Sequence, residues 1–472
     1  MKIRIISVLV LMCMLASFCA CGSAGERIYV ALDSMPETLD AQVASSDSEL
    51  LIARNIYEGL FRQNDKGEIV PAAVKSYTFD GLTYTFKLKE NLKWSDGKPL
   101  VAGDFAFGIK RALLPETKAP FARLLYPIAG AIEAHNGAGS IDNLGISAID
   151  NNTLQIKLSY DDKSFIKTLS MPVAMPCRQS FFNDSTGKYG LEKEWVLSNG
   201  TYKIARWNKE DNGIRLYVNE EYKGDFKAKN NGIFIARDKQ KTVAEKLVSG
   251  EADIALVPSK YLNDINTNGI KTKSVENICW MLSIGEDFNV NIRRALYTCI
   301  SRDIYKEELS AGFNIATSFF PGCLGNIDAV FEANYNPQGA RDIISQEIKE
   351  SKNKRFPQTT LVYYDSESVR PVITAIVGNW QKNLSAFINI KSTEKSLEGE
   401  LSTHSLPLSV FPVKADSTLE EYTYKLGENY YTGYNLVPIA YEDTTVGYNK
   451  NISGVSINAA GGYIDFSYVI KK

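Results

Sequence analysis

The residue types that most often carry out chemistry are few in this chain and lie in no catalytic spacing. The two histidines, His135 and His404, are far apart, so neither belongs to a metal-binding repeat such as H-E-x-x-H. Either could act as the base of a catalytic triad, but no G-x-S-x-G nucleophile elbow accompanies them. Walker and dinucleotide-binding loops do not occur. We therefore expect no catalytic residue, no metal and no cofactor, although a carboxylate pair for glycoside hydrolysis stays open.

The cysteines favour neither a metal site nor a disulfide framework. Those beyond the N-terminal segment are scattered and form no C-x-x-C pair: Cys177, Cys279, Cys299 and Cys323. A bridge between Cys279 and Cys299 stays open in an oxidising compartment, because sequence alone cannot bring two thiols together.

The N-terminus predicts export and lipid attachment. Lys2 and Arg4 precede an apolar stretch over residues 5–20, which is typical of a signal peptide rather than a membrane span. Small residues surround Cys21, so residues 1–20 are expected to be removed and Cys21 to carry the lipid, with residues 21–25 as a tether. Plain secretion is the alternative. Either way the chain is extracytoplasmic, and the lipid would hold it at the outer face of the cytoplasmic membrane or in the periplasm.

The net charge and the length of the chain narrow the class of protein to which it can belong. The formal net charge of -2 argues against nucleic-acid binding, which needs a basic surface. At 472 residues the chain is too long for one ordinary core, so we expect two or more lobes. The 25 tyrosines suit an adaptable ligand surface, but strand positions explain many of them.

Strand and helix patterns alternate along the chain, which predicts an α/β fold with mixed sheets. Residues 27–32 alternate as a strand, and residues 45–60 carry a helical apolar stripe. Residues 82–94 predict two strands paired through a turn at Glu90 and Asn91. The tail after residue 436 predicts short strands.

One long segment resembles a known family. Residues 82–115 (LTYTFKLKENLKWSDGKPLVAGDFAFGIKRALLP) are similar to the signature of the bacterial oligopeptide-binding proteins, the receptors of peptide ABC importers in extracellular solute-binding family 5. Further matches follow in the family's order, among them NIYEGLF at 55–61, SNGTYKIARW at 198–207 and GEADIALVP at 250–258. One departure is Val101, where the family usually has a threonine that caps a helix. We expect this helix to begin less well capped, at a cost of about 1 kcal/mol.

The resemblance implies a two-lobed periplasmic-binding-protein-like fold with an extra inserted domain and a ligand cleft between the lobes. The first lobe is expected to be discontinuous, over residues 26–63, 188–272 and 442–472. The inserted domain would span residues 64–187, and the second lobe residues 273–441.

The resemblance also implies ligand-binding residues. Asp416 aligns with the aspartate that pairs with a peptide's α-amino group, although a solvated loop aspartate is the alternative. Ser45, Ser46 and Asp47 align beside the bound peptide, unless one of them simply caps the following helix. The remaining candidates are Phe121, which could instead be a core residue, with Tyr126, Val413, Tyr441 and Glu442.

The predicted function is that of a non-enzymatic, monomeric substrate-binding lipoprotein. It would capture short peptides between two closing lobes and deliver them to ABC transporter permease subunits. The alternatives are the same fold with a non-peptide solute, a peptide-sensing receptor, and a secreted hydrolase.

Overall fold

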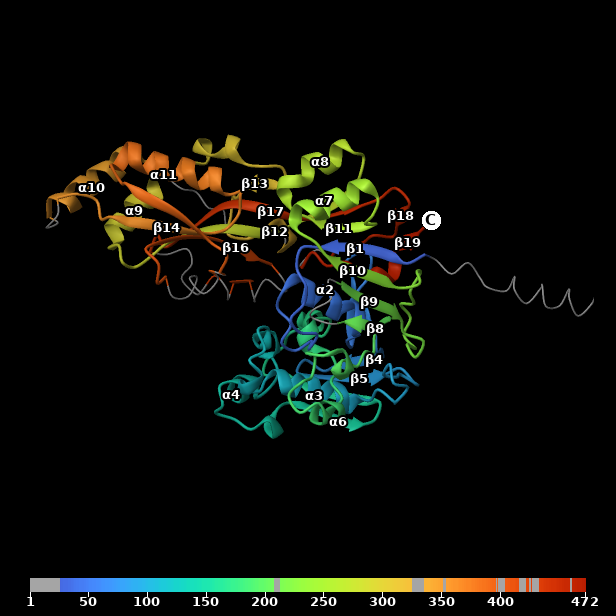
Figure 1. The fold of residues 1–472 in the computed structure, drawn as a ribbon. Coiled ribbons are helices and arrows are strands. Elements are labelled where there is room, and N and C mark those ends of the chain that lie inside the picture. The colour runs from blue at the N-terminus through green and yellow to red at the C-terminus, as the bar shows by residue number, and fades with distance from the viewer. Residues whose placement is uncertain are drawn as a thin grey trace, which may run out of the picture.

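The structure is a computed structural model that describes residues 26–207, 213–324, 335–350, 354–395, 397, 404–415, 422–423, 426, 433–458 and 461–472. Its largest element is a mixed eleven-stranded sheet. Ten strands follow the order β15-β14-β16-β12-β17-β11-β1-β10-β9-β8, and the eleventh, β13, pairs with β17. Figure 1 shows three bodies: one lobe around α7 and α8, a second around α9, α10 and α11, and a domain with α3, α4 and α6 below the first.

The first lobe holds one end of the large sheet. Alternating apolar residues make its strands, whose buried faces include Ile28, Val30 and Ile235. Helix α7 ends at Gly250, whose φ of +82° is a left-handed conformation that glycine tolerates. The elements are β1 (Ile28–Leu32), α2 (Asp47–Ile56), β8 (Tyr202–Trp207), β9 (Gly213–Val218), β10 (Ile233–Arg237), α7 (Gln240–Ser249), β11 (Ile254–Val257) and α8 (Leu262–Thr267).

The inserted domain has its own four-stranded antiparallel sheet in the order β4-β5-β7-β6. It is entered through the short pair β2 (Phe61–Gln63) and β3 (Ile69–Pro71). The domain comprises β4 (Val74–Phe79), β5 (Thr83–Leu88), α3 (Ala102–Ala112), α4 (Ala131–His135), β6 (Ile146–Asp150), β7 (Thr153–Lys157), α5 (Phe165–Thr168) and α6 (Gln179–Asp184).

The second lobe holds the other end of the large sheet. Strands β14 and β15 run parallel and are joined through helix α11, so the three elements form a β-α-β unit. Its elements are α9 (Val290–Thr298), β13 (Phe313–Ile315), α10 (Pro337–Glu350), β14 (Thr359–Tyr364), α11 (Arg370–Leu384), β15 (Ile388–Thr393) and β16 (Leu408–Lys414).

Two long strands, β12 (Lys271–Ile284) and β17 (Leu436–Tyr448), join the lobes. The C-terminal end of β17 pairs with β11 of the first lobe, whereas the C-terminal half of β12 pairs with β16 of the second. Their mutual register shifts between Glu276 and Ile278 and again between Trp280 and Met281. Such bulges bend a strand, and these lie where the chain passes from one lobe to the other.

The hydrophobic cores separate the second lobe from the rest of the molecule. One contiguous cluster runs through the first lobe and the inserted domain, from Ile28 and Leu50 to Phe86 and Phe105. A second cluster draws its members from Cys279 to Tyr441 and includes the fully buried Trp380. A hinge between two such bodies leaves each core intact. The domain boundaries given above stay predictions.

The structure confirms most of the predicted elements and corrects two. Helix α3 begins at an N-cap, Val101, whose side chain makes no capping hydrogen bond, as its departure from threonine predicted. Residues 82–94 do not form a hairpin: β5 pairs with β4 and β7, and Asn91 takes a φ of +60°. The tail is also not built of short strands only, because β17 is 13 residues long. No helix in the described part of the chain is long and apolar enough to cross a membrane.

Candidate functional site

A cavity of about 500 Å³ lies between the two lobes. This volume is in the range of about 300–1,000 Å³ that is usual for small-ligand sites. On the side of the first lobe, the cavity is lined by residues at the ends of β1 and β11 and at the start of helix α2. On the side of the second lobe, it is lined by residues that follow β14 and β15. Strands β12 and β17 form its floor through Ile278, Trp280 and residues 442–445.

The sheet topology explains why polar residues gather here. Strands β1 and β11 are parallel neighbours in the first lobe, as β14 and β15 are in the second. Residues one or two positions after their carboxyl ends line the cavity, namely Asp33, Ser259, Asp365 and Glu394. Ligands of open α/β sheets bind outside the carboxyl ends of the strands. The two lobes thus present the same kind of edge to one another.

Glu442 is a partly buried carboxylate of the cavity lining that two neutral donors hold in place. Its Oε1 accepts a hydrogen bond from Ser259 Oγ at 2.7 Å, and its Oε2 accepts one from Trp280 Nε1 at 2.8 Å. Burial raises the pKa of Glu442 above its ordinary value, against the lowering effect of these two donors. No ion pair with Glu442 occurs within the described ranges. The floor of the cavity therefore holds a carboxylate that is fixed in position by neutral donors.

Two ion pairs connect the lobes across the cavity. Lys414 Nζ at the end of β16 lies 2.5 Å from Asp47 Oδ1 at the start of α2. Lys260 Nζ, after β11, lies 2.9 Å from Glu367 Oε2, after β14. Both pairs join residues that are remote in sequence and belong to different lobes.

The serines and the aspartate at the start of α2 have different surroundings. Ser46 is the N-cap: its Oγ accepts the N–H of Glu49 at 3.4 Å, and Glu49 Oε2 accepts the N–H of Ser46 at 2.9 Å. The same Oε2 accepts the N–H of Ser45 at 2.9 Å. The capping role weighed for this segment is thus confirmed for Ser46. Asp47 lines the cavity, whereas Ser45 and Ser46 do not.

Four other predicted residues have side chains outside the cavity lining. Phe121 is buried in the core of the inserted domain, which is the alternative weighed for it. The Tyr126 hydroxyl lies 2.8 Å from His135 Nδ1 in the same domain. The Val413 side chain is fully buried in the second core. The Tyr441 hydroxyl donates to the backbone oxygen of Ser318 at 2.8 Å. Of the predicted ligand residues that lie within the described ranges, the structure places Asp47 and Glu442 in the cavity lining.

Asp416 and Cys21 lie outside the described residues. The neighbouring Ala415 is buried, and its N–H donates to the backbone oxygen of Asn277 at 2.8 Å, beside the bulge of β12.

Several residues of the lining were missed by sequence reasoning, including Lys260, Trp280, Tyr364, Asp365 and Glu394. Asp365 directly follows β14 and Glu394 directly follows β15, so their position at the end of a strand is the signal that these two residues share. That signal becomes specific only when the strand order is known, because it requires strands of both lobes to end at one place.

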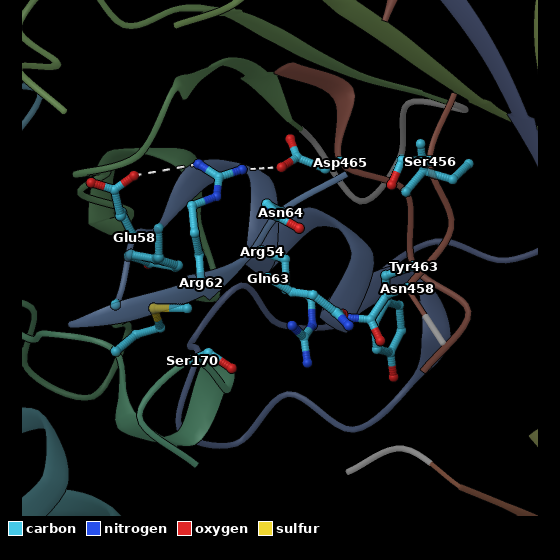
Figure 2. A pocket seen from close by; sticks show the side chains of 14 residues that line it. Arg54, Glu58, Arg62, Gln63, Asn64, Ser170, Ser456, Asn458, Tyr463 and Asp465 are labelled. Carbon is cyan, nitrogen blue, oxygen red and sulfur yellow. Dashed lines mark hydrogen bonds and ion pairs between the residues drawn. The ribbon is translucent and has the colours of Figure 1, made fainter. Parts of the chain in front are cut away.

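A second, smaller hollow of about 50 Å³ lies between α2, β2 and the C-terminal segment (Figure 2). Arg62 crosses it and pairs with Glu58 at 3.4 Å and with Asp465. Glu58 also accepts a hydrogen bond from Tyr222. Because Arg62, Glu58 and Asp465 are already paired with one another and the volume of the hollow is a tenth of that of the cavity between the lobes, we assign it a structural role.

The chemistry of the described residues does not include a metal centre or an activated thiol. No group of three or more histidine, cysteine or acidic side chains within the described ranges is arranged to hold a metal. Cys279 and Cys299 do not form the disulfide that the sequence left open, because both thiols are free and buried. Burial raises the pKa of Cys177 and of Cys299 to about 11, so these thiols are protonated and poor nucleophiles at neutral pH.

Comparison with known proteins agrees with this geometry. Residues 68–434 match the family model described as bacterial extracellular solute-binding proteins, family 5 middle. The oligopeptide-binding protein OppA of Bacillus subtilis is 25% identical over 83% of this chain and 77% of its own length. The dipeptide-binding protein DppE of the same organism is 26% identical over 79% and 71%.

The fold is that of two-lobed peptide-binding proteins. OppA of Burkholderia pseudomallei superposes with a TM-score of 0.81 at 15% identity, covering 96% of this chain and all of that one. OppA of Listeria monocytogenes, solved bound to peptide, gives 0.79 at 19% identity and covers 95% and 100%. The relatives are substrate-binding proteins rather than enzymes. The family match over most of the chain, together with this fold, shows that the chain belongs to the family 5 bacterial extracellular solute-binding proteins.

Proposed function

We propose that this protein is the substrate-binding lipoprotein of an ABC importer, which captures short peptides between its lobes and delivers them to a membrane permease. The observation that carries the proposal is the cavity of about 500 Å³ between two lobes with separate cores. The names of the relatives, which are oligopeptide- and dipeptide-binding proteins, support peptides as the ligand.

Hinge closure is the expected mechanism of capture. The bulged strands β12 and β17 are the connection that bends, and the Lys414–Asp47 and Lys260–Glu367 pairs hold the lobes together across the ligand. A ligand that contacts both lobes binds the closed form more tightly and shifts the population towards it.

Closure and peptide binding are tested together by incubating the purified mature chain with a mixed peptide library. Mass spectrometry identifies what is retained, and small-angle scattering follows the radius of gyration. We expect short peptides to be retained, to reduce the radius and to raise the melting temperature. A chain that retains no peptide, or that retains a non-peptide solute or cleaves the peptides, contradicts the proposal. Bound peptide without compaction contradicts hinge closure.

Membrane attachment is proposed to run through Cys21. β1 begins at Ile28, so the folded part starts within a few residues of that cysteine. Cys21→Ala should leave the protein unprocessed or free of the membrane, as judged by fractionation and by labelling with a radioactive fatty acid. Continued lipidation of this variant would move the anchor to another cysteine.

For the ligand's α-amino group we propose Asp416 as the partner, because the resemblance aligns it with the family's aspartate. Removing one member of a buried ion pair costs roughly 3–5 kcal/mol. Asp416→Asn should therefore weaken binding of a free peptide strongly and that of its N-acetylated form much less. Calorimetry of both proteins with both peptides completes the cycle. Independent, additive losses would reject this role even if peptides bind.

A further inference from the structure

We propose that the ligands this protein selects are cationic peptides, with lysine or arginine side chains in addition to the α-amino group. The inference rests on the proposed function, because it names the class of ligand for the same cavity. It derives from the charge that the lining presents.

The lining of the cavity is strongly acidic. Among the described residues, the lining contains one basic side chain, Lys260, against seven carboxylates, which are Asp33, Asp47, Asp365, Glu367, Glu394, Glu442 and Asp443. The whole chain, in contrast, has 53 basic and 55 acidic side chains, so the excess of carboxylates belongs to this place and not to the composition.

Only two of these carboxylates have cationic partners within the described part of the chain. Lys260 pairs with Glu367, and Lys414 pairs with Asp47. Asp33 accepts a hydrogen bond from the neutral amide of Gln240 at 3.1 Å, and Glu442 accepts from Ser259 and Trp280. Five of the seven carboxylates therefore line the cavity without a cationic partner among the described residues.

The shape of the site strengthens the effect of these charges. A concave cleft with walls of one sign focuses the field and concentrates ions of the opposite sign. Glu442 and Asp443 lie on the hinge strand β17 at the floor, where burial raises the pKa of both groups. An incoming cation would favour their ionised forms and offset the cost of their burial.

Two aromatic residues also belong to the lining of the cavity. Trp280 and Tyr364 come from different strands and both border the cavity. The face of an aromatic ring attracts an ammonium or guanidinium group, most strongly where water is excluded. Trp280 is in addition fixed beside Glu442 by its Nε1 hydrogen bond of 2.8 Å. The same part of the floor therefore offers a carboxylate and an indole.

The distribution of the carboxylates favours a peptide over a metal ion. The structure contains no group of three potential ligands close enough to hold a metal, as far as the described residues extend. The acidic side chains instead line both lobes and the floor, from Asp33 to Glu394. Separate positive charges along an extended ligand match this arrangement, whereas a single ion does not.

The test compares tripeptides that differ only in charge: Lys-Ala-Lys, Ala-Ala-Ala and Glu-Ala-Glu. Their dissociation constants are measured by calorimetry with the mature chain at about 0.01 M and about 0.5 M salt. We expect Lys-Ala-Lys to bind about tenfold tighter than Ala-Ala-Ala, or better, at low salt, and Glu-Ala-Glu to bind more weakly than both. The differences should shrink at high salt because the rim charges are screened.

Matched variants assign the selectivity to the lining. Asp365→Asn combined with Glu394→Gln removes two carboxylates without cationic partners and should reduce the preference for Lys-Ala-Lys over Ala-Ala-Ala several-fold, because the peptide with three positive charges loses more attraction than the peptide with one. Glu251→Gln is the control, because Glu251 is exposed and lies beyond the other end of helix α7 from the cavity. This control should retain the full preference.

The outcomes separate the inference from the proposed function. Equal affinity for all three tripeptides, a preference for Glu-Ala-Glu, or a preference that the double variant leaves unchanged would overturn the cationic selectivity while peptide binding stands. Failure of every peptide in the library to bind would overturn the proposed function itself.

Discussion

Breaking the buried ion pair between Asp40 and Arg111 by replacing one partner should be among the most destabilising single changes in this protein. Asp40 precedes helix α2 in the first lobe, and Arg111 is in the last turn of α3 in the inserted domain. Arg111 Nη1 lies 2.7 Å from Asp40 Oδ2, and the two side chains are 5% and 8% exposed. The guanidinium also lies over the rings of Phe182 and Tyr189, at 4.7 and 5.1 Å.

Asp40→Asn would leave the guanidinium buried without its counter-charge. Loss of one partner of a buried pair costs about 3–5 kcal/mol. We expect the lower end of this range, about 3 kcal/mol, because asparagine keeps the shape and one acceptor and because Gln42 also accepts from Arg111. Out of a total stability of about 5–15 kcal/mol, this is a large fraction.

Urea unfolding followed by intrinsic fluorescence measures the loss. The control is Glu90→Gln, since Glu90 pairs with Lys75 at 3.9 Å and both side chains are more than half exposed, at 75% and 66%. Its effect should stay within about 0.5 kcal/mol. Asp40→Asn with Arg111→Met removes the stranded charge and should be more stable than Asp40→Asn alone. A loss below about 1 kcal/mol for Asp40→Asn, or a double variant less stable than that single one, would refute the reasoning.

Three further predictions concern capping, packing and pH. Val101→Thr gives α3 the N-cap acceptor that it lacks and should stabilise the protein by about 1 kcal/mol in urea unfolding; no gain would mean that the cap is already satisfied. Gly108→Ala should destabilise the protein by about 1–3 kcal/mol, because the added Cβ would lie 2.3 Å from the Met175 backbone oxygen. Gly378→Ala, whose Cβ would enter open space within helix α11, should stabilise the protein by up to about 1 kcal/mol. Equal effects of the two substitutions would contradict this packing. Because burial raises the pKa of Glu442, its contribution to stability is present below its ordinary pKa and lost as the pH rises through the raised value. Glu442→Gln should flatten the unfolding free energy over that window, and an unchanged pH profile would count against it.

The sequence determined those features that depend on local pattern. Alternating apolar residues specified β1, and the apolar stripe specified α2, although that helix ends at Ile56 rather than near residue 60. The missing cap at Val101 could be predicted because a cap is made within one turn. The resemblance over residues 82–115 was sufficient to predict the two-lobed fold, which the structural comparison confirms.

Pairing partners were decided by the tertiary structure. The alternation of residues 82–88 specifies a strand but not its neighbours, and β5 pairs with β4 and β7 instead of with the segment after the Asn91 turn. The length of β17 likewise follows from its pairing with β12 through both lobes, a contact between residues more than 150 positions apart. Periodicity reports which face of a strand is buried and carries no information about such long-range pairing.

The acidic cavity was decided in the same way. Asp33, Asp365 and Glu394 each follow a different strand, and in the sequence they are ordinary loop carboxylates in a nearly neutral chain. They face one cavity only because parallel strands of two lobes end opposite one another across the β12–β17 connection. Electrostatic potential depends on distance in space, so the charge of the site is a property of the fold rather than of the composition.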